Sequence, residues 1–309
     1  MKIVILDADT LGECDLSEIK TLGEVTSYGF SKKDEVLTRC KDAEIILTNK
    51  VVLDESILSA LPSLKLICIT ATGMNNVDLD CAAKRGIEVK NVAGYSTSDV
   101  AQHTMSMVLH LLAKLSYYDE YCKSGEWAKS PIFVHINGGL KELENLQWGI
   151  IGFGSIGQRV AHLAQAFGAK VSYYSTSGKN TQSSFEHKEL DKILSQSDIV
   201  SIHAPLNPST KNLINRTNLP LLKDGAILIN VGRGGIVNEE DMTAFLKDKD
   251  MYFGTDVLEA EPMRAGHPFL DKSIATKLLI TPHVAWAYDR ARERLLALTA
   301  KNIRDFLNK

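Results

Sequence analysis

The sequence predicts an α/β protein with two doubly wound parallel sheets. Short apolar segments alternate with amphipathic helical segments along most of the 309 residues, which is the pattern of parallel strands joined by crossover helices. A glycine-rich motif at residues 152–157 lies between a predicted strand and a predicted helix. The chain is also long enough for two domains, each with its own hydrophobic core.

The glycine motif has the spacing Gly152-x-Gly154-x-x-Gly157 and follows the apolar segment 148–151. The first glycine allows a tight turn, the second lets the backbone approach a pyrophosphate, and the third lets helix and strand pack closely. N–H groups at the start of the helix would face the phosphates. Because a strand at 171–174 completes the unit, we expect dinucleotide binding rather than a purely structural turn. The predicted apolar face of the helix consists of Ile156, Val160, Leu163 and Phe167.

Composition and charge exclude several classes of function. A net charge of −3 argues against a nucleic-acid partner, because neutralising phosphates requires clustered Lys and Arg. No apolar run reaches the roughly 18–20 residues of a membrane span, and residues 1–7 are typical of a first strand rather than a signal peptide. The five cysteines are scattered without a C-x-x-C pair. We therefore expect reduced thiols in the cytoplasm, with neither a disulfide framework nor a metal site.

The first 97 residues form a βα domain of their own. Its loop at 70–78 carries a glycine after a predicted strand, where open α/β sheets bind ligands through backbone N–H groups. An ordinary loop with Asn and Asp as helix caps is the alternative. We expect strands at 3–6, 45–47 and 66–69, and helices at 33–41, 54–61 and 78–85.

A long helix is expected at 100–118, capped by residues 96–99. The polar segment 123–146 has no clear periodicity, and because loops of this length are usually functional or interfacial, we interpret it as a dimerisation arm. The last segment, about 288–307, is an amphipathic helix expected to cross back to the first domain. Beyond the glycine motif we expect strands at 199–203, 226–230, 252–256 and 278–280, and helices at 216–222 and 239–247.

Three ionisable residues stand at or just past the ends of predicted strands: Arg233, Glu261 and His283. Each has an ordinary explanation when taken singly, since a loop Arg or Glu is usually solvated and a lone His is usually a structural hydrogen bonder. The carboxyl ends of parallel strands share one edge of a sheet, where the dinucleotide would also lie. Together the three residues therefore indicate a catalytic site.

The chain resembles the D-isomer-specific 2-hydroxyacid dehydrogenase family along essentially its whole length. The matching segments, in the family's order and spacing, are 152–157, 203–206, 230–235, 256–262 and 281–283, and the loop 71–78 resembles the family's substrate loop. Residues 95–97, 101–104 and 283–286 look most like the glycerate dehydrogenase (hydroxypyruvate reductase) branch. The resemblance implies a Rossmann domain at 98–287 inserted in a flavodoxin-like substrate domain, which consists of 1–97 completed by helix 288–309.

The resemblance also implies roles for the three ionisable residues. Arg233 would bind the substrate carboxylate, because its planar fork matches a carboxylate bidentately. His283 would be the general acid in reduction and the base in oxidation. Glu261 would orient His283 and stabilise its charged form. The family's formate dehydrogenases have Gln at this position, so a carboxylate favours acid–base chemistry on a hydroxy acid.

The remaining implied contacts fall into two groups. Substrate would be held by backbone N–H groups of Thr72, Gly73 and Met74 and by side chains such as Lys50, Tyr95 and Trp286, although core packing is the alternative for Trp286. The implied cofactor contacts are Thr104, Gly152, Phe153, Gly154, Ser155, Ile156, Gly157, Ser175, Thr176, Ser177, Lys179, His203, Ala204, Pro205, Thr210, Val231, Gly232, Asp256, His283 and Ala285. Among these, Asp256 would hold the nicotinamide amide.

One position departs from the NAD-preferring pattern. Members that prefer NAD usually carry an acidic residue at the end of the second Rossmann strand, where it binds the ribose hydroxyls. Here that position is Ser175, followed by Thr176, Ser177 and Lys179. Hydroxyls and a lysine could bind the 2′-phosphate of NADP, while Lys179 as a solvated loop charge is the alternative. The sequence therefore leaves NAD and NADP both open.

We expect a cytoplasmic, homodimeric NAD(P)-dependent reductase of a small 2-keto acid, with hydroxypyruvate/glycerate as the first substrate pair. The first domain would close on the second and exclude water before hydride transfer. D-Lactate or glyoxylate chemistry is the alternative within the enzyme class. A dinucleotide-sensing binding protein, similar to the family's C-terminal-binding corepressors, is the alternative outside it, and turnover of a 2-keto acid would discriminate the two.

Overall fold

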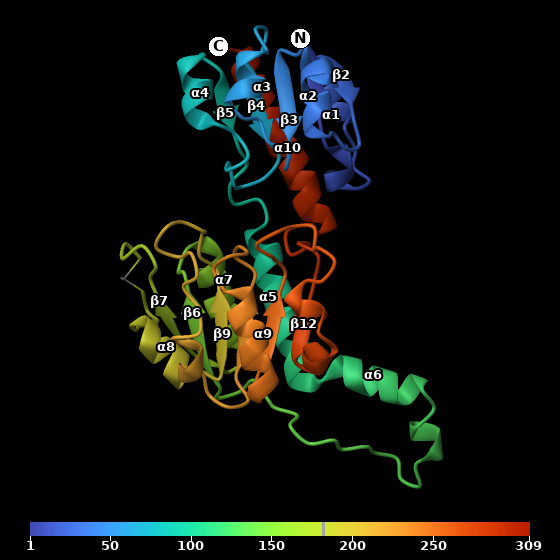
Figure 1. Cartoon of the computed structure of the whole chain (residues 1–309), viewed down its shortest axis with the longest axis vertical. Coiled ribbons are helices and arrows are strands. Elements are labelled where there is room, and N and C mark those ends of the chain that lie inside the picture. Colours follow the sequence, from blue (N-terminus) through green and yellow to red (C-terminus); the bar gives the residue numbers. More distant parts are fainter. Residues whose placement is uncertain (181–182) are drawn as a thin grey trace. The chain divides into compact units, whose positions relative to one another are not determined.

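The computed structural model describes residues 1–180 and 183–309, which fall into two compact units (Figure 1). The first unit consists of Met1–Ser96 and Trp286–Lys309, and the second of Thr97–Ala285. Each unit contains one sheet in which all paired strands are parallel. The predicted α/β class with two parallel sheets is confirmed.

The first unit has a five-stranded sheet in the order β2-β1-β3-β4-β5, which is the flavodoxin-like order. All four residues of β3 and of β4 are buried, and this explains their continuous apolar sequences. The strands are β1 (Lys2–Ile5), β2 (Glu24–Ser27), β3 (Ile45–Thr48), β4 (Leu66–Ile69) and β5 (Glu88–Lys90). The helices are α1 (Ser17–Lys20), α2 (Lys33–Cys40), α3 (Glu55–Ser59), α4 (Leu79–Lys84) and α10 (Asp289–Leu307).

Two separate cores cover the faces of this sheet. One contains Val36 of α2, Leu58 of α3 and Ala82 of α4, and the other contains Ile19 of α1 and Leu295 of α10. Helix α10 therefore belongs to the first unit, although the whole of the second unit, Thr97–Ala285, precedes it in the chain. Its apolar face, buried against the sheet, holds it there.

The second unit has a seven-stranded sheet in the order β12-β11-β10-β9-β6-β7-β8. The chain runs outward from β6 to β8, then returns to pair β9 with β6 and continues in the other direction. This is a Rossmann order with one added strand, and its topological switch point lies between β6 and β9. The strands are β6 (Gln147–Ile151), β7 (Lys170–Tyr174), β8 (Glu186–His187), β9 (Ile199–Ile202), β10 (Ile227–Asn230), β11 (Tyr252–Thr255) and β12 (Leu278–Ile280). The main helices are α5 (Thr97–Ala113), α6 (Leu115–Lys123), α7 (Ser155–Ala166), α8 (Leu190–Gln196) and α9 (Glu239–Asp248).

The buried face of α7 differs from the prediction. Its buried residues are Gly157, Val160, Ala161 and Ala164, whereas Phe167 is 51% exposed. Small residues let α7 lie close against α5 and the sheet, and Phe167 is already the residue that ends the helix. The prediction from the larger apolar residues was therefore wrong in including Phe167 in the buried face.

Two helix predictions were wrong in part. The helix expected at 216–222 is only a 3-10 turn at Leu219–Leu221, because Pro220 lacks the N–H that a longer helix needs. The helix expected at 100–118 is two helices, α5 and α6, which meet at Lys114. Lys114 has φ 48°, a left-handed conformation that ends α5 and redirects the chain.

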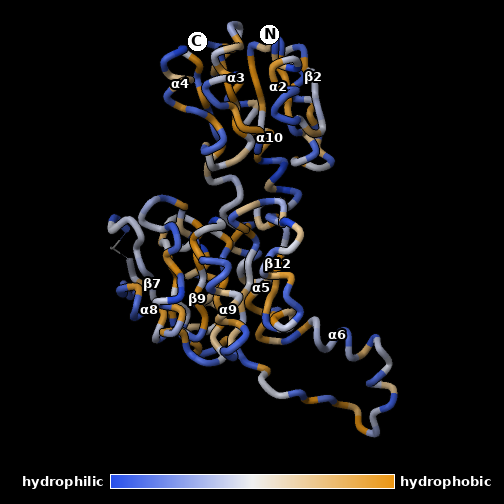
Figure 2. The backbone as a smooth tube through the Cα atoms, in the orientation of Figure 1, coloured by the Kyte–Doolittle hydropathy of each residue, from blue (hydrophilic) through white to orange (hydrophobic). Residues whose placement is uncertain are grey.

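Helix α6 and the residues after it extend away from the second unit's sheet (Figure 1). Helix α6 has no buried residue, and the segment beyond it contains an apolar stretch (Figure 2). Ile132 and Phe133 in this segment are exposed. None of the helices in the described part of the chain combines the length and the apolarity that a bilayer span needs.

A buried carboxylate fastens the first unit's β3–α3 loop. Asp7, 3% exposed, accepts backbone N–H groups from Asn49 at 2.9 Å, Lys50 at 2.7 Å and Val51 at 3.3 Å. We expect Asp7→Ala to lower the free energy of unfolding by about 3 kcal/mol, because buried donors lose their acceptor. Urea unfolding measures this. Asp42→Ala removes an exposed ion pair with Lys2 and should cost less than about 0.5 kcal/mol; equal losses in the two variants would contradict the assignment.

Candidate active site

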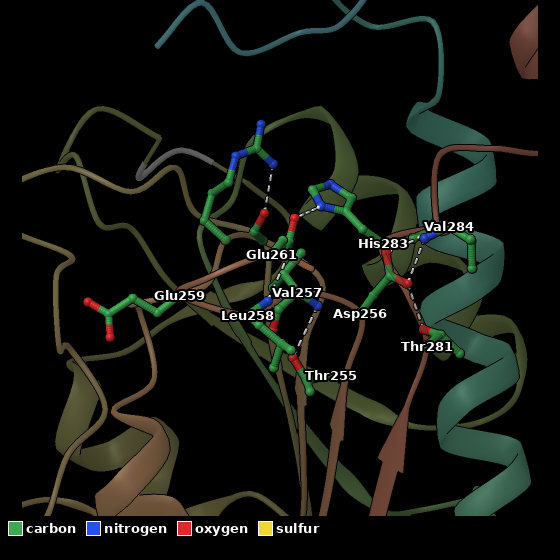
Figure 3. Close-up of polar contacts among 12 residues, drawn as sticks. Thr255, Asp256, Val257, Leu258, Glu259, Glu261, Thr281, His283 and Val284 are labelled. Atoms are coloured by element: carbon green, nitrogen blue, oxygen red, sulfur yellow. Dashed lines mark hydrogen bonds and ion pairs between the residues drawn. The ribbon is translucent and has the colours of Figure 1, made fainter. Parts of the chain in front are cut away.

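Three neighbouring strands bring the predicted catalytic residues to one edge of the second unit. Arg233 follows β10, Glu261 follows β11 and His283 follows β12. These strands are adjacent and parallel in the sheet, so their carboxyl ends meet at the same edge. Figure 3 shows Glu261 and His283 directed toward one another above these strand ends.

Glu261 and His283 form a close pair. The Nδ1 atom of His283 lies 2.6 Å from Oε2 of Glu261, and Oε1 of Glu261 accepts the backbone N–H of Leu258 at 2.9 Å. An ionised carboxylate only accepts hydrogen bonds, so Nδ1 carries a proton. This leaves Nε2 of His283, which has no partner among the described residues, as the nitrogen that can exchange a proton.

Arg233 stands on a rigid turn. The Asn230 side chain closes the turn by donating to the Arg233 carbonyl at 2.9 Å and accepting from the Gly232 N–H at 3.1 Å. A Cβ on Gly234 would overlap the backbone of Leu258, so this turn packs directly on the chain that leads to Glu261. The guanidinium donates to the Gly232 carbonyl at 2.8 Å and has no acidic partner in the described part of the chain. Its other N–H groups can therefore bind a carboxylate.

Asp256 and Ala285 lie at the same edge of the second unit's sheet. Asp256, 1% exposed, accepts the Thr281 hydroxyl at 2.6 Å and the Val284 N–H at 2.9 Å through Oδ1. Its Oδ2 accepts the Ala285 N–H at 2.9 Å. Since a carboxylate oxygen has two lone pairs, Oδ2 keeps room for one further donor.

The glycine turn has the shape that a dinucleotide requires. Gly152 has φ 89°, and a Cβ there would lie 2.7 Å from the Ala204 nitrogen. A Cβ on Gly157 would overlap the Gly152 carbonyl. Gly154 precedes α7 with φ −80°, and a Cβ there would meet nothing. The backbone conformation at 154 suits any residue, and no described atom is close enough to exclude a side chain there. Close approach of a phosphate would explain the glycine.

The three side chains of the turn lie differently. Phe153 is buried and stacks on Tyr173 with ring centroids 3.8 Å apart, so only its backbone can face a ligand. Ser155 is exposed and Ile156 is half-buried. The backbone N–H groups at the start of α7 are therefore the main polar atoms that the turn offers.

His203 supplies a buried donor at the switch point. Trp148 donates its indole N–H to Ser201 at 2.9 Å, and the Ser201 hydroxyl lies 2.9 Å from Nε2 of His203. No other acceptor for that hydroxyl occurs among the described residues, so Nε2 accepts and Nδ1 carries the proton. Burial lowers the pKa of His203 to about 3, which keeps the ring neutral. Its buried Nδ1 has no partner in the described structure, as expected of a group that faces an additional molecule.

Other predicted cofactor residues have structural contacts of their own. The hydroxyl of Thr210 donates to the Pro205 carbonyl at 2.7 Å and closes that loop. Ala204 and Val231 are buried, and a Cβ on Gly232 would lie 2.8 Å from the Ala204 carbonyl oxygen. Thr104 is fully buried, and its hydroxyl donates to the Val100 carbonyl at 2.8 Å within α5. This hydroxyl proton already has an acceptor, so the structure does not support the predicted cofactor contact.

The turn after β7 carries no carboxylate at residues 175–180. Ser175 is buried, Thr176 is half-buried, and Ser177 and Lys179 are exposed. The Gly178 N–H bonds the Ser175 carbonyl at 3.2 Å and closes the turn. Lys179 forms no ion pair with any described residue, and its ammonium group is therefore available to an anion.

The predicted substrate residues lie in the first unit, after β3 and β4 or at the start of its C-terminal segment. Lys50 is exposed and its backbone is held by Asp7. The Thr72 hydroxyl donates to the Val92 carbonyl at 3.1 Å, Gly73 is half-buried and Met74 is 36% exposed. Trp286 meets Tyr95 edge-on, with ring centroids 6.2 Å apart, and packs partly against the core.

Several residues that build the site were not predicted. Asn230 and Thr281 stand at strand ends, like Arg233 and Glu261, and that position was the signal that could have found them. His103, within α5, lies 3.0 Å from the Thr281 hydroxyl, and nothing local in the sequence indicates this contact. No group of His, Cys, Asp and Glu residues in the described ranges could hold a metal ion.

Comparison with known proteins identifies the family. The family model for the NAD binding domain of D-isomer specific 2-hydroxyacid dehydrogenases matches residues 105–285. A hydroxypyruvate reductase of Blautia hydrogenotrophica is 34% identical over 99% of this chain and 97% of its own length. A glycerate dehydrogenase of Methylorubrum extorquens is 33% identical over 99% and 96%. The crystal structure of the TT0316 protein from Thermus thermophilus superposes with a TM-score of 0.90 at 31% identity, covering 100% of this chain and 97% of that one.

The matched region includes the glycine turn, Arg233, Glu261 and His283. The chain therefore belongs to the D-isomer specific 2-hydroxyacid dehydrogenase family and is an NAD-dependent oxidoreductase that interconverts 2-keto and D-2-hydroxy acids.

Proposed function

We propose that this enzyme reduces hydroxypyruvate to D-glycerate, with Arg233, Glu261 and His283 as its catalytic residues. The observation that carries the proposal is the 2.6 Å pair of Glu261 and His283, beside an Arg233 without an acidic partner in the described chain. A carboxylate-binding cation after β10 and a proton donor after β12, with Glu261 after the intervening β11, suit a 2-keto acid, which offers a carboxylate and a carbonyl on neighbouring carbons.

Each catalytic residue has a distinct task. Arg233 binds the substrate carboxylate through its free N–H groups. Nε2 of His283 donates a proton to the carbonyl oxygen in reduction and removes it from the hydroxyl in oxidation. Glu261 holds Nδ1, which fixes the ring and stabilises its protonated form. The bound dinucleotide supplies or takes up the hydride at C2 of the acid.

We propose the remaining contacts by unit. In the second unit, the start of α7, Nδ1 of His203 and Oδ2 of Asp256 bind the dinucleotide. In the first unit, the backbone N–H groups of residues 72–74 bind the substrate carboxylate. Lys50 and Trp286 contact the rest of the substrate, and this part of the proposal rests on the family resemblance.

The choice of hydroxypyruvate rests on two observations. The relatives reported above are named a hydroxypyruvate reductase and a glycerate dehydrogenase. The segments 95–97, 101–104 and 283–286 also look most like that branch. D-Lactate or glyoxylate chemistry is the alternative, because the proposed catalytic residues act on the carboxylate and the C2 carbonyl that hydroxypyruvate, pyruvate and glyoxylate share.

Turnover of three keto acids tests this proposal. We expect hydroxypyruvate to be reduced with a higher kcat/KM than glyoxylate or pyruvate, measured as loss of reduced nicotinamide absorbance. His283→Ala should lower kcat at least about 100-fold, because the proton donor is lost. His162→Ala, which removes an exposed histidine of α7 bonded to the Gln158 carbonyl, should retain activity. Faster turnover of pyruvate or glyoxylate would overturn the substrate assignment.

We further propose that the enzyme accepts NADPH as well as NADH. Ser175 leaves no carboxylate to repel a 2′-phosphate, and Lys179, which forms no ion pair with any described residue, can bind that phosphate. Ser175→Asp should raise the KM for NADPH about tenfold or more, through repulsion between the carboxylate and the phosphate. The KM for NADH should not rise. Thr217→Asp, at an exposed position, controls for added charge, and equal effects on both cofactors would contradict the assignment.

We also propose that the enzyme is a homodimer formed through α6 and the segment 124–140. This surface exposes large apolar side chains, Trp127, Ile132, Phe133 and Ile136, at 49%, 60%, 87% and 76%, which is unusual outside interfaces. The segment is fastened to α6 by Tyr121 and His135, whose rings stack 3.9 Å apart. Ordered apolar groups of this kind suit a second copy.

Sedimentation velocity tests the dimer. The wild-type protein should sediment as a species with about twice the monomer mass of 34.0 kDa. Phe133→Asp with Ile136→Asp should dissociate it, because two charges would be buried at the interface. Phe30→Asp, which alters a first-unit side chain that is 67% exposed, should leave the dimer intact. A monomeric wild type would refute the assignment.

The thiols support a cytoplasmic location. All five cysteines are free, and Cys40, Cys68 and Cys81 are buried. Burial raises the pKa of Cys40 and of Cys68 to about 12, so these thiols stay protonated and unreactive. We propose that the enzyme works in a reducing compartment, the cytoplasm.

A further inference from the structure

A partly buried polar network lies next to the loop that carries His283. It joins His103 of α5, Thr281 at the end of β12 and Asp256 at the end of β11. Figure 3 shows Asp256 beside Thr281 and Val284, beneath His283. We propose that His103, Thr281 and Asp256 are positioning residues that fix the backbone of His283 and thereby aim its ring at Glu261.

This inference rests on the proposed catalytic role of His283. It adds three residues that need not touch the substrate to act. Asp256 binds Thr281 and Val284 through Oδ1 and Ala285 through Oδ2, and the second lone pair of Oδ2 keeps its proposed cofactor contact.

The direction of each hydrogen bond follows from the atoms present. Thr281 has one hydroxyl proton, and its oxygen lies 2.6 Å from Oδ1 of Asp256, which can only accept. The same oxygen lies 3.0 Å from Nε2 of His103. It must therefore accept from His103, whose Nε2 carries a proton. The chain of donors runs from His103 through Thr281 to Asp256.

Charge and burial keep this arrangement in place. The Nε2 atom of His103 is 3.8 Å from Oδ1 of Asp256. Burial lowers the pKa of His103 and the Asp256 carboxylate opposes that change. A neutral ring with a proton on Nε2 satisfies both influences, because it donates toward the carboxylate without a buried positive charge.

The backbone of His283 needs such support. His283 has φ 56°, a left-handed conformation that residues with a Cβ rarely adopt. Such conformations persist where the surrounding structure holds them, and they cluster at functional sites. Here the next two backbone N–H groups, of Val284 and Ala285, are both bound by Asp256.

Glu261 has an anchor outside this network. Its Oε1 accepts the Leu258 N–H within its own loop. Loosening the loop 281–285 would therefore move His283 relative to a fixed Glu261. A displacement of about 1 Å in a catalytic group can cost about 100-fold in rate.

Thr281→Val tests the network, because it removes the hydroxyl and keeps the branched shape. Hydrogen exchange of the Val284 and Ala285 amides, measured without cofactor or substrate, should quicken about tenfold or more. The kcat should fall at least about tenfold while the KM for the keto acid stays within about threefold, because ground-state binding does not use His283. Thr281→Ser keeps the hydroxyl and should restore both values.

Two further variants separate positioning from general destabilisation. Thr299→Val removes the hydroxyl of a fully buried threonine, which is bonded to the Leu295 carbonyl in α10, and should alter neither measurement. His103→Leu combined with Thr281→Val should be no worse than either change alone, since both interrupt the same chain of bonds. Fully additive losses in the double variant would remove His103 from the network.

Unchanged exchange of the two amides in Thr281→Val would overturn the proposal, whatever the activity. Faster exchange with an unchanged kcat would overturn the link to catalysis and would count against His283 as the proton donor. Exchange is measured on the free protein, so a wild type that reduces no keto acid would refute the proposed function, while amide exchange in Thr281→Val would still support or overturn the positioning network.

Discussion

Close backbone packing where β6 meets β9 determines how the second unit is built. Gly152 turns with its backbone against Ala204, and Gly157 of α7 rests on the Gly152 carbonyl, with no space for a side chain at either glycine. These contacts bring the start of α7 against the end of β6. The same contacts bring His203, the residue that follows β9, beside the glycine turn. The shape of the proposed dinucleotide-binding turn at residues 152–157 therefore depends on backbone packing more than on side chains.

The parts of the fold that could be predicted are those with a periodic or positional signal. Strands such as β3 and β4 are short apolar runs because both faces of a parallel sheet are covered. Arg233, Glu261 and His283 could be placed at one edge of the sheet because each follows the end of such a strand. The break at Lys114 could not be found, because a left-handed lysine has no signature in a helical sequence. The exposed Phe167 was misjudged because helix packing here depends on glycine and alanine, which hydropathy undervalues.

The polar contacts behind the site were beyond sequence reasoning. His103 and Thr281 are 178 residues apart in the chain, and no local pattern joins two side chains at that distance. The side chains of Asn230 and Thr210 bind backbone carbonyls and close turns. A sequence motif can indicate such a position, but it does not show whether the side chain binds a ligand or the backbone. Hydrogen-bond direction and tautomer follow only from a complete set of neighbours, as the series Trp148, Ser201 and His203 illustrates.

The burial of His203 also makes the stability of the second unit depend on pH. An unfolded chain protonates a histidine near its ordinary pKa of about 6.5, whereas burial lowers the pKa of His203 in the fold to about 3. The unfolded state therefore binds more protons than the folded state between these values, and His203 favours unfolding increasingly as the pH falls through this range. The residue that offers a neutral donor at the switch point thus also makes the dinucleotide domain sensitive to acid.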